Sequence, residues 1–315
     1  MSSVIAPLSR PVVSWSPPDP ADRRRSPQTR RTALITALGV TAAAISAFFG
    51  NEAIFVIAFL FVISWPLERI WRRHPVPVRR LALRTDLAYA AASPALIFAG
   101  TVVAAVLAVV SLMWLPGLAF RPLVRSLPVW LELVVGVLLF DVLIYWTHRW
   151  SHTVPLLWRF HAVHHSTRHL DWVSGFRNHP LDGAFMAPVF AFFIGAGFDG
   201  RITGGLAAVQ FVIGLWAHLN VRWRLRPLHR IVLTPDFHHW HHANQPEAHN
   251  TNFSTFLPLW DIVFGSYYMP ADQRPQRYGV DDPVPLTIGR QLAYPFRGLR
   301  SAFRERRRAR RATAG

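Results

Sequence analysis

Long apolar runs, separated by short polar breaks, occupy the first two thirds of the chain. A membrane-spanning helix needs about 20 mostly apolar residues, so the pattern predicts four to six membrane segments. The clearest is 127–146, whereas 87–115 is long enough for one tilted span or a bent hairpin. The runs cover residues 33–50, 53–65, 87–115, 127–146, 184–198 and 203–219.

The composition agrees with a membrane protein. Charged residues make up 16% of the 315 residues and hydrophobic residues 51%, whereas soluble domains carry about 25% charge. The net charge is +17, and the basic residues are all arginine, with dense blocks within 10–31, 69–84 and 290–311. Basic blocks can bind nucleic acid, but beside apolar spans they are typical of cytoplasmic flanks. We therefore expect a membrane partner and no nucleic acid.

Cysteine is absent, and histidine is concentrated in one third of the chain. Without Cys the sequence cannot supply an iron–sulfur cluster, a c-type haem attachment or a CxxC redox pair. Of the 15 histidines, every one except His74 lies between His148 and His249. This concentration points to metal chemistry in that region.

Three histidine clusters have helical spacing. The first continues the span 127–146 without Gly or Pro, so its two histidines at i and i+4 share one helix face. The others follow the helix starts at Thr153 to Pro155 and at Thr234-Pro235, and each repeats the offsets i, i+3 and i+4. The clusters consist of His148 and His152; His161, His164 and His165; and His238, His241 and His242.

Asp141 and Tyr145 lie on the same helical stripe as the first cluster. A carboxylate within an apolar span is costly and suggests a functional role. The sequence leaves two roles open for Asp141. It can orient a ligand imidazole from behind, or it can be a structural partner for an arginine or a backbone group.

Imidazole binds zinc, copper, iron and nickel, and eight to ten imidazoles exceed the needs of one ion. Two redox metals beside a membrane can activate dioxygen and attack an unactivated C–H bond. Zinc is redox-inert, and a zinc-dependent membrane hydrolase would need a carboxylate base. No HExxH motif is present and the clusters contain no Glu. A non-catalytic membrane protein that handles metal remains a further alternative.

The ordered motifs resemble the fatty acid hydroxylase / sterol desaturase superfamily over about residues 125–270. HRWSH, FHAVHHS and HHWHH are similar to its HxxxH, HxxHH and HxxHH set. Further segments follow in the order seen in its bacterial members. They are LWRFH at 157–161, RNHP at 177–180, AHLN at 217–220, Thr234-Pro235 and WDIVFG at 260–265.

The resemblance implies an all-α fold, in which multi-pass transmembrane helices are capped by a cytosolic helical metal-binding region. It implies a catalytic domain at 125–270, preceded by membrane segments at 32–124 and followed by a basic tail at 271–315. The Pro-, Ser- and Arg-rich composition of residues 1–31 predicts a disordered tail there. The location would be the inner membrane of a bacterium, with the active site on the cytoplasmic side.

The implied activity is hydroxylation or desaturation of a lipid (sterol, fatty acyl, carotenoid or related) by a di-iron centre. Dioxygen and a separate ferredoxin- or cytochrome-b5-like electron donor would take part, and zinc could substitute for the two irons. His239 falls at a variable motif position and is left out. The implied core ligands, which are also the catalytic residues, are His148, His152, His161, His164, His165, His238, His241 and His242, with His179 and His218 as additional metal ligands.

Overall fold

The computed structural model describes residues 37, 41, 52–75, 80 and 82–298. Within these residues the fold is helical, as predicted, and β-pairing is limited to two isolated bridges, Arg72 with Val221 and Ala243 with Tyr278. Short 3-10 turns connect several of the helices. The α-helices are α2 (Glu52–Ile70), α3 (Leu83–Val110), α4 (Trp114–Ser126), α5 (Val129–Thr153), α6 (Pro155–His165), α7 (Pro180–Ala184), α8 (Ala187–Ala196), α9 (Gly200–Ala217), α10 (Pro235–His241), α11 (Leu259–Val263) and α12 (Ile288–Ala293).

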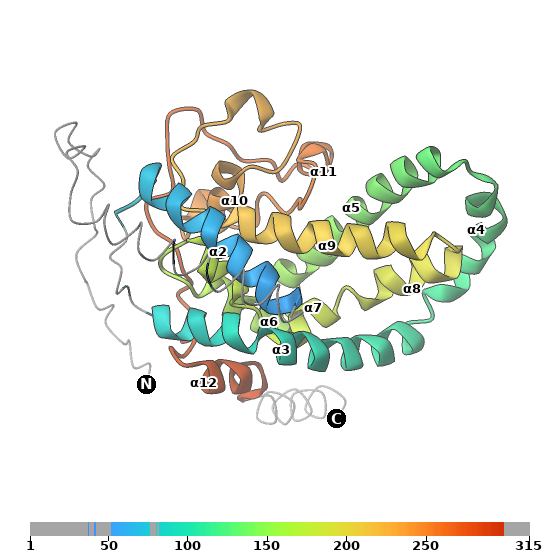
Figure 1. Ribbon diagram of the computed structural model, residues 1–315, viewed down its shortest axis with the longest axis horizontal. Coiled ribbons are helices and arrows are strands. Elements are labelled where there is room, and N and C mark those ends of the chain that lie inside the picture. Colours follow the sequence, from blue (N-terminus) through green and yellow to red (C-terminus); the bar gives the residue numbers. More distant parts are fainter. Residues whose placement is uncertain (1–36, 38–40, 42–51, 76–79, 81, 299–315) are drawn as a thin grey trace, which may run out of the picture.

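The long helices α3, α5 and α9 extend along the long axis of the molecule, and α4 closes one end of it (Figure 1). The histidine-bearing helices α6 and α10 lie toward the other end. Phe140 and Ile144 of α5 pack with Phe193 of α8 and Leu206 of α9 in a buried apolar core. This core fixes the direction of α5, whose last turns carry His148 and His152.

Two described helices, α5 and α9, are long and apolar enough to cross a membrane. A third candidate is α3, whose halves Leu83–Ser93 and Ala95–Val110 meet at an angle of 67°. The region, for which a tilted span or a bent hairpin was expected, is thus a helix bent in its middle. The described residues thus hold two or three candidate spans, and the apolar run 33–50, which was counted among the four to six predicted, lies almost wholly outside them.

Helix α4 was not predicted. Pro116 and Pro122 interrupt its sequence, and Pro normally disfavours a helix interior. It forms because it packs tightly on α8. A Cβ at Gly117 would lie 2.5 Å from the carbonyl oxygen of Phe192, so a larger side chain would force the two helices apart.

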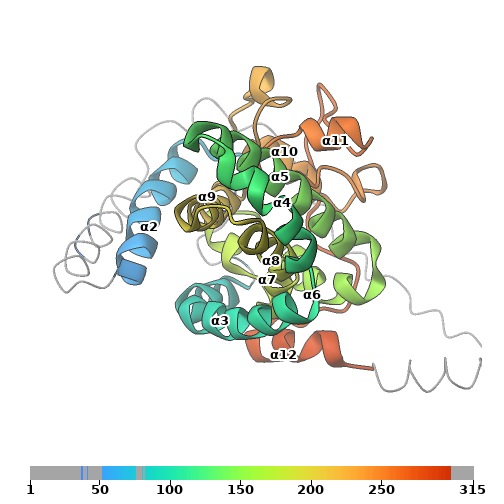
Figure 2. The same ribbon diagram turned by 90° about the vertical axis from the view of Figure 1, so that its right-hand side faces the viewer.

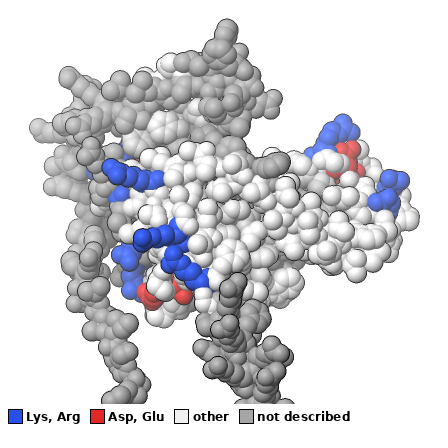
Figure 3. Space-filling view, turned by 90° about the horizontal axis from the view of Figure 1, so that it is seen from below, with Lys and Arg blue, Asp and Glu red and all other residues white. Residues whose placement is uncertain are grey.

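Charged side chains on the face seen in Figure 3 gather toward the two ends of the long axis, and the surface between them is uncharged. The helices in that middle part expose apolar residues, among them Val102 and Val106 of α3. An uncharged belt between charged ends is typical of a membrane-spanning protein. The arrangement supports a multi-pass helical membrane protein.

Residues 271–298 pack against the histidine-bearing part of the chain. The backbone N–H of Asn244 donates to the carbonyl of Arg277 over 2.8 Å. Tyr278 is buried, and Gln291 of α12 is fully buried. Helix α12 and the 3-10 turn Tyr294–Phe296 lie beside α6 and cover the lower side of the fold (Figure 2).

Candidate metal centre

The three histidine clusters lie on three helices that meet at one place. The continuation of α5 through HRWSH is confirmed, and α6 and α10 begin at the predicted prolines, Pro155 and Pro235. The side chain of Thr234 caps α10 by accepting a hydrogen bond from the N–H of Phe237. Capping fixes the start of the helix and therefore which way its imidazoles point.

Five imidazoles converge where α5, α6 and α10 meet. One ring nitrogen from each lies within 4.8 Å of every other, so the group could hold a metal ion. The Nε2 atoms of His148 and His161 are 3.2 Å apart. We call this set the five-His group; it consists of His148, His152, His161, His165 and His241.

A second set of four imidazoles lies beside the first, with the same 4.8 Å limit between its ring nitrogens. The Nε2 atoms of His238 and His242 are 3.0 Å apart. His218, the residue after α9, joins this set, although the sequence showed it only as an isolated histidine. We call it the four-His group; it consists of His164, His218, His238 and His242, all of them buried.

The two groups adjoin because α6 and α10 each contribute to both. His164 and His165 are consecutive on α6, and His241 and His242 are consecutive at the end of α10. The rings of His165 and His242, one from each group, stack with centroids 4.1 Å apart. Two ions held by these groups would therefore be close neighbours, which is the arrangement that dinuclear chemistry needs.

Backbone carbonyls behind the rings fix which nitrogen faces inward. His148 Nδ1 lies 2.7 Å from the carbonyl of Phe253, and His241 Nδ1 lies 2.9 Å from that of Thr251. His164 Nδ1 contacts the carbonyl of Arg177 at 3.1 Å. A carbonyl only accepts, so each Nδ1 carries the proton and each Nε2 keeps a lone pair for a metal.

One imidazole is oriented by a carboxylate. His161 Nδ1 lies 2.8 Å from Asp182 of α7. The sequence had suggested this role for Asp141 as one of two alternatives. Asp141 instead takes the structural role: it accepts hydrogen bonds from the backbone N–H groups of Phe256 and Leu257 and from the indole of Trp260. Asp182 gave no sequence signal, because it lies outside the histidine motifs.

Several inward nitrogens are buried without a hydrogen-bond partner. They are the Nε2 atoms of His152, His165, His218 and His241 and the Nδ1 atom of His242. An unsatisfied buried polar atom costs about 1–3 kcal/mol. A cation bound by these nitrogens would remove that cost, so the residues fit a metal.

The electrostatics favour neutral rings. Burial, followed by the nearby imidazoles of His152 and His241, lowers the pKa of His165 well below its ordinary value. Burial and neighbouring imidazoles act in the same direction on the pKa of His164 and of His238. A metal binds the neutral form of imidazole, so no proton needs to be displaced at neutral pH.

Two of the six histidines outside both groups concern the predicted ligand set. His179, expected as an additional ligand, caps α7: its Nδ1 accepts from the N–H of Leu181, and its Nε2 lies 3.1 Å from the carbonyl of Leu292. Both of its nitrogens are therefore engaged. His239, which was left out of the predicted set, contacts Tyr278 and the carbonyl of Leu219.

A buried charge network supports the four-His group. The carboxylate of Asp86 on α3 pairs with the guanidinium groups of Arg80 and Arg177, and all three side chains are buried. Because the carbonyl of Arg177 contacts His164, the network also fixes one ring of the group. Buried charges are tolerated only when they are paired in this way.

The comparisons with known proteins agree with this arrangement. The fatty acid hydroxylase family matches residues 133–266. Ornithine lipid hydroxylase OlsE of Rhizobium tropici is 33% identical over 172 residues, which cover 54% of this chain and 51% of that protein. Alkylglycerol monooxygenase of Homo sapiens is 28% identical over 163 residues, covering 49% of this chain and 34% of that protein.

Very-long-chain aldehyde decarbonylase GL1-4 of Oryza sativa subsp. japonica is 27% identical over 181 residues, covering 51% of this chain and 28% of that protein. No solved structure matches the chain. The chain spans about half the length, or less, of these relatives. Residues 133–266, which match the fatty acid hydroxylase family, include all nine histidines of the two groups.

Proposed function

We propose that the chain is a membrane oxidoreductase that hydroxylates or desaturates a lipid at a pair of iron ions, using dioxygen and two external electrons. The observation that carries the proposal is the convergence of nine histidines into two adjoining groups at the end of an apolar helix. Nitrogen-only donor sets suit several metals. Iron is favoured because the reaction needs a change of redox state, which zinc cannot undergo.

When bound, the metal pair supplies dioxygen activation and C–H oxidation. Hydroxylation consumes one dioxygen, two electrons and two protons and releases one water, whereas desaturation releases two. The chain's own residues hold the donors in place and exclude water. The rings of His164, His165 and His238 are buried, and the carbonyls behind the groups keep their nitrogens aimed inward. Exclusion of water limits side reactions of oxidised species.

The substrate class follows from the membrane setting and from the relatives. Ornithine lipids and alkylglycerols, named by two relatives, are lipids with a polar headgroup. We propose a substrate of this kind, whose hydrocarbon part comes from the bilayer beside α5. Placement of the attacked carbon would decide between an alcohol and an alkene, since small displacements change the outcome strongly.

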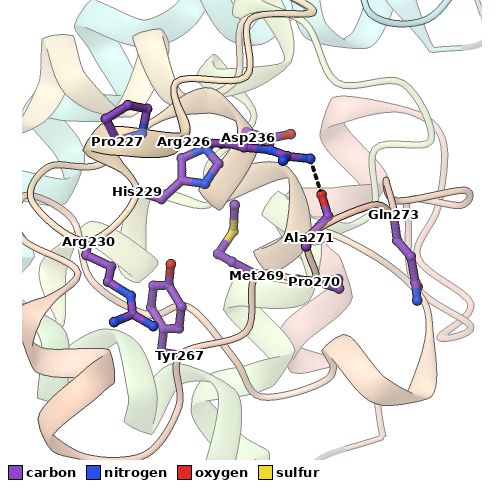
Figure 4. Close-up of a pocket in the computed structure, with 10 residues that line it drawn as sticks. All are labelled: Arg226, Pro227, His229, Arg230, Asp236, Tyr267, Met269, Pro270, Ala271 and Gln273. Atoms are coloured by element: carbon purple, nitrogen blue, oxygen red, sulfur yellow. Dashed lines mark hydrogen bonds and ion pairs between the residues drawn. The ribbon is translucent and has the colours of Figure 1, made fainter.

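An arginine-lined recess on the outer side of α10 supports docking of an acidic electron donor. Its volume is about 280 Å³, and Arg226, His229 and Arg230 line it (Figure 4). Asp236, on the first turn of α10, also borders the recess, and His238 follows it by two residues. Positive charge would steer an acidic redox protein to this side, and by the positive-inside rule this side would be the cytoplasmic one.

The test is lipid mass spectrometry of cells with and without the chain, grown under ¹⁸O₂. Hydroxylation predicts a product heavier by one labelled oxygen, and desaturation a product lighter by two hydrogens. The His164→Ala variant should lose the product while still inserting in the membrane. His249→Ala, which changes an exposed histidine outside both groups, is the matched control.

Metal analysis of the purified protein separates the alternatives. The proposal expects close to two iron ions per chain and activity that tracks the iron. Activity that tracks zinc would point to a hydrolase. Bound metal without any change in the lipids would point to a metal-handling protein.

A further inference from the structure

The segment 253–264, which contains the short helix α11, lies on one face of α5. Asp141 is the middle residue of α5, with twelve residues on either side, so it lies about 18 Å from each helix end. The hydrogen bonds from Phe256, Leu257 and Trp260 to its carboxylate are 2.9–3.0 Å long. The segment is therefore attached at the midpoint of a candidate membrane span (Figures 1 and 2).

The face of α5 that carries this segment is apolar and exposed on the preceding turns. Trp130, Val134 and Leu138 are spaced four residues apart and are 67%, 48% and 40% exposed. Asp141 and Tyr145 continue the same stripe, because residues three and four apart share a helix face. The segment covers Asp141 and Tyr145. Just after the segment, Ser266 Oγ lies 2.8 Å from the Tyr145 hydroxyl. It thus occupies the side of the span that faces the bilayer.

The outward surface of the segment is apolar. Leu259, Ile262 and Val263 are 42%, 44% and 59% exposed. The one ionisable residue between 253 and 264, Asp261, is fully buried and accepts hydrogen bonds from the backbone N–H groups of Phe253 and Ser254. Exposed apolar residues at this depth would be unfavourable in water and favourable in hydrocarbon.

The backbone of the segment also meets the requirement for entering a bilayer. Non-helical backbone is tolerated at membrane depth only where its polar groups are satisfied by protein. The two internal carboxylates, Asp141 and Asp261, accept hydrogen bonds from four backbone N–H groups of the segment. Asp141, a carboxylate in an apolar span that the sequence marked as unusual, is thereby explained: it satisfies the backbone of this segment.

We propose that residues 253–264 form a re-entrant element embedded in the hydrocarbon of the bilayer, in addition to the helices that cross it. The carbonyl of Phe253, at the start of the element, contacts His148. The element thus places acyl chains directly beside the five-His group. The proposal rests on the membrane-spanning character of α5 and not on the proposed activity.

Single introduced cysteines can test this proposal. The chain contains no cysteine, so each variant carries one thiol at a known position. Ile262→Cys and Val263→Cys probe the element, Leu138→Cys provides a reference on the exposed face of α5, and Asp272→Cys provides an aqueous reference. A membrane-impermeant maleimide is applied to each variant in proteoliposomes permeabilised to expose both sides. The reactive species is the thiolate, which apolar surroundings disfavour, so we expect both test cysteines to react at least ~10-fold more slowly than Asp272→Cys.

A nitroxide attached to the same cysteines gives an independent measurement of depth. The proposal expects the labels at Ile262 and Val263 to collide frequently with dioxygen and rarely with a water-soluble nickel chelate, as at Leu138. Nickel accessibility equal to that at Asp272 would overturn it. Equal maleimide labelling of all variants in sodium dodecyl sulfate verifies that each thiol is intact. If Ile262→Cys does not purify as a folded protein, Val263→Cys decides alone.

Discussion

The two histidine groups share helices α6 and α10 but differ in what surrounds them. The five-His group lies at the end of α5, and two of its rings, His148 and His152, are only partly buried. The carbonyl of Phe253 orients His148, and the carbonyl of Thr251 orients His241. The four-His group is wholly buried and depends on His218 at the end of α9 and on the carbonyl of Arg177. The five-His group thus borders the segment 253–264, and the four-His group depends on the buried charge network of Asp86, Arg80 and Arg177.

The difference suggests that different substitutions will affect the two groups. Damage to the charge network should affect mainly the four-His group, whereas damage on the side of α5 and α7 should affect mainly the five-His group. The number of donors also differs. Loss of one ring leaves four donors in the larger group and three in the smaller one. Four kinds of variant test this difference between the groups.

The largest effect is expected from Asp86→Ala. The change leaves the guanidinium group of Arg177 buried without its carboxylate, whereas Arg80 keeps its ion pair with Asp171. Breaking a buried charge pair costs about 3–5 kcal/mol. Thermal unfolding in detergent measures the loss of stability. The four-His group should lose metal before the five-His group does. Unchanged unfolding would contradict the assigned role of the network.

The paired variants His218→Ala and His152→Ala compare the groups directly. Removal of a ligand should weaken metal binding by at least about 100-fold, the upper end of what loss of an outer partner costs. We expect His218→Ala to lose more metal than His152→Ala, because fewer donors remain. Metal content after dialysis against a chelator provides the measurement. The opposite order would show that donor number does not govern retention.

A smaller effect is expected from Asp182→Ala, which removes the carboxylate behind His161. Outer partners of this kind typically contribute 10–100-fold to metal affinity. The loss should be confined to the five-His group. Asp182→Asn, which keeps an acceptor oxygen without the charge, should restore part of the affinity in a competition titration. No difference between the two variants would argue against a hydrogen-bonding role.

Thr234→Ala should give the smallest effect. It removes the cap of α10, and losing such a cap costs about 0.5–2 kcal/mol. Because α10 supplies ligands to both groups, both should lose metal to a similar extent. A selective loss from one group would mean that the two groups respond independently to the position of α10.

The local elements that the sequence predicted follow from short-range physics. Helical spacing and absence of Gly and Pro predicted that HRWSH continues α5, and Thr234-Pro235 predicted the start of α10. Helix α4 was missed because its prolines argue against a helix, and its contact with α8 outweighs them. The choice of His218 over His179 was also out of reach, since both appear in the sequence as single histidines.

The sequence alone predicted metal chemistry beside a membrane. It did so from three helical histidine clusters next to an apolar span, the absence of cysteine and motifs that resemble one superfamily. The tertiary structure decided how the rings divide into five and four, which acidic residue supports an imidazole, and where Asp141 points. Periodicity specifies the face of a helix on which a side chain lies. Which faces meet depends on packing between segments as distant as residues 141 and 257, and no local pattern encodes that.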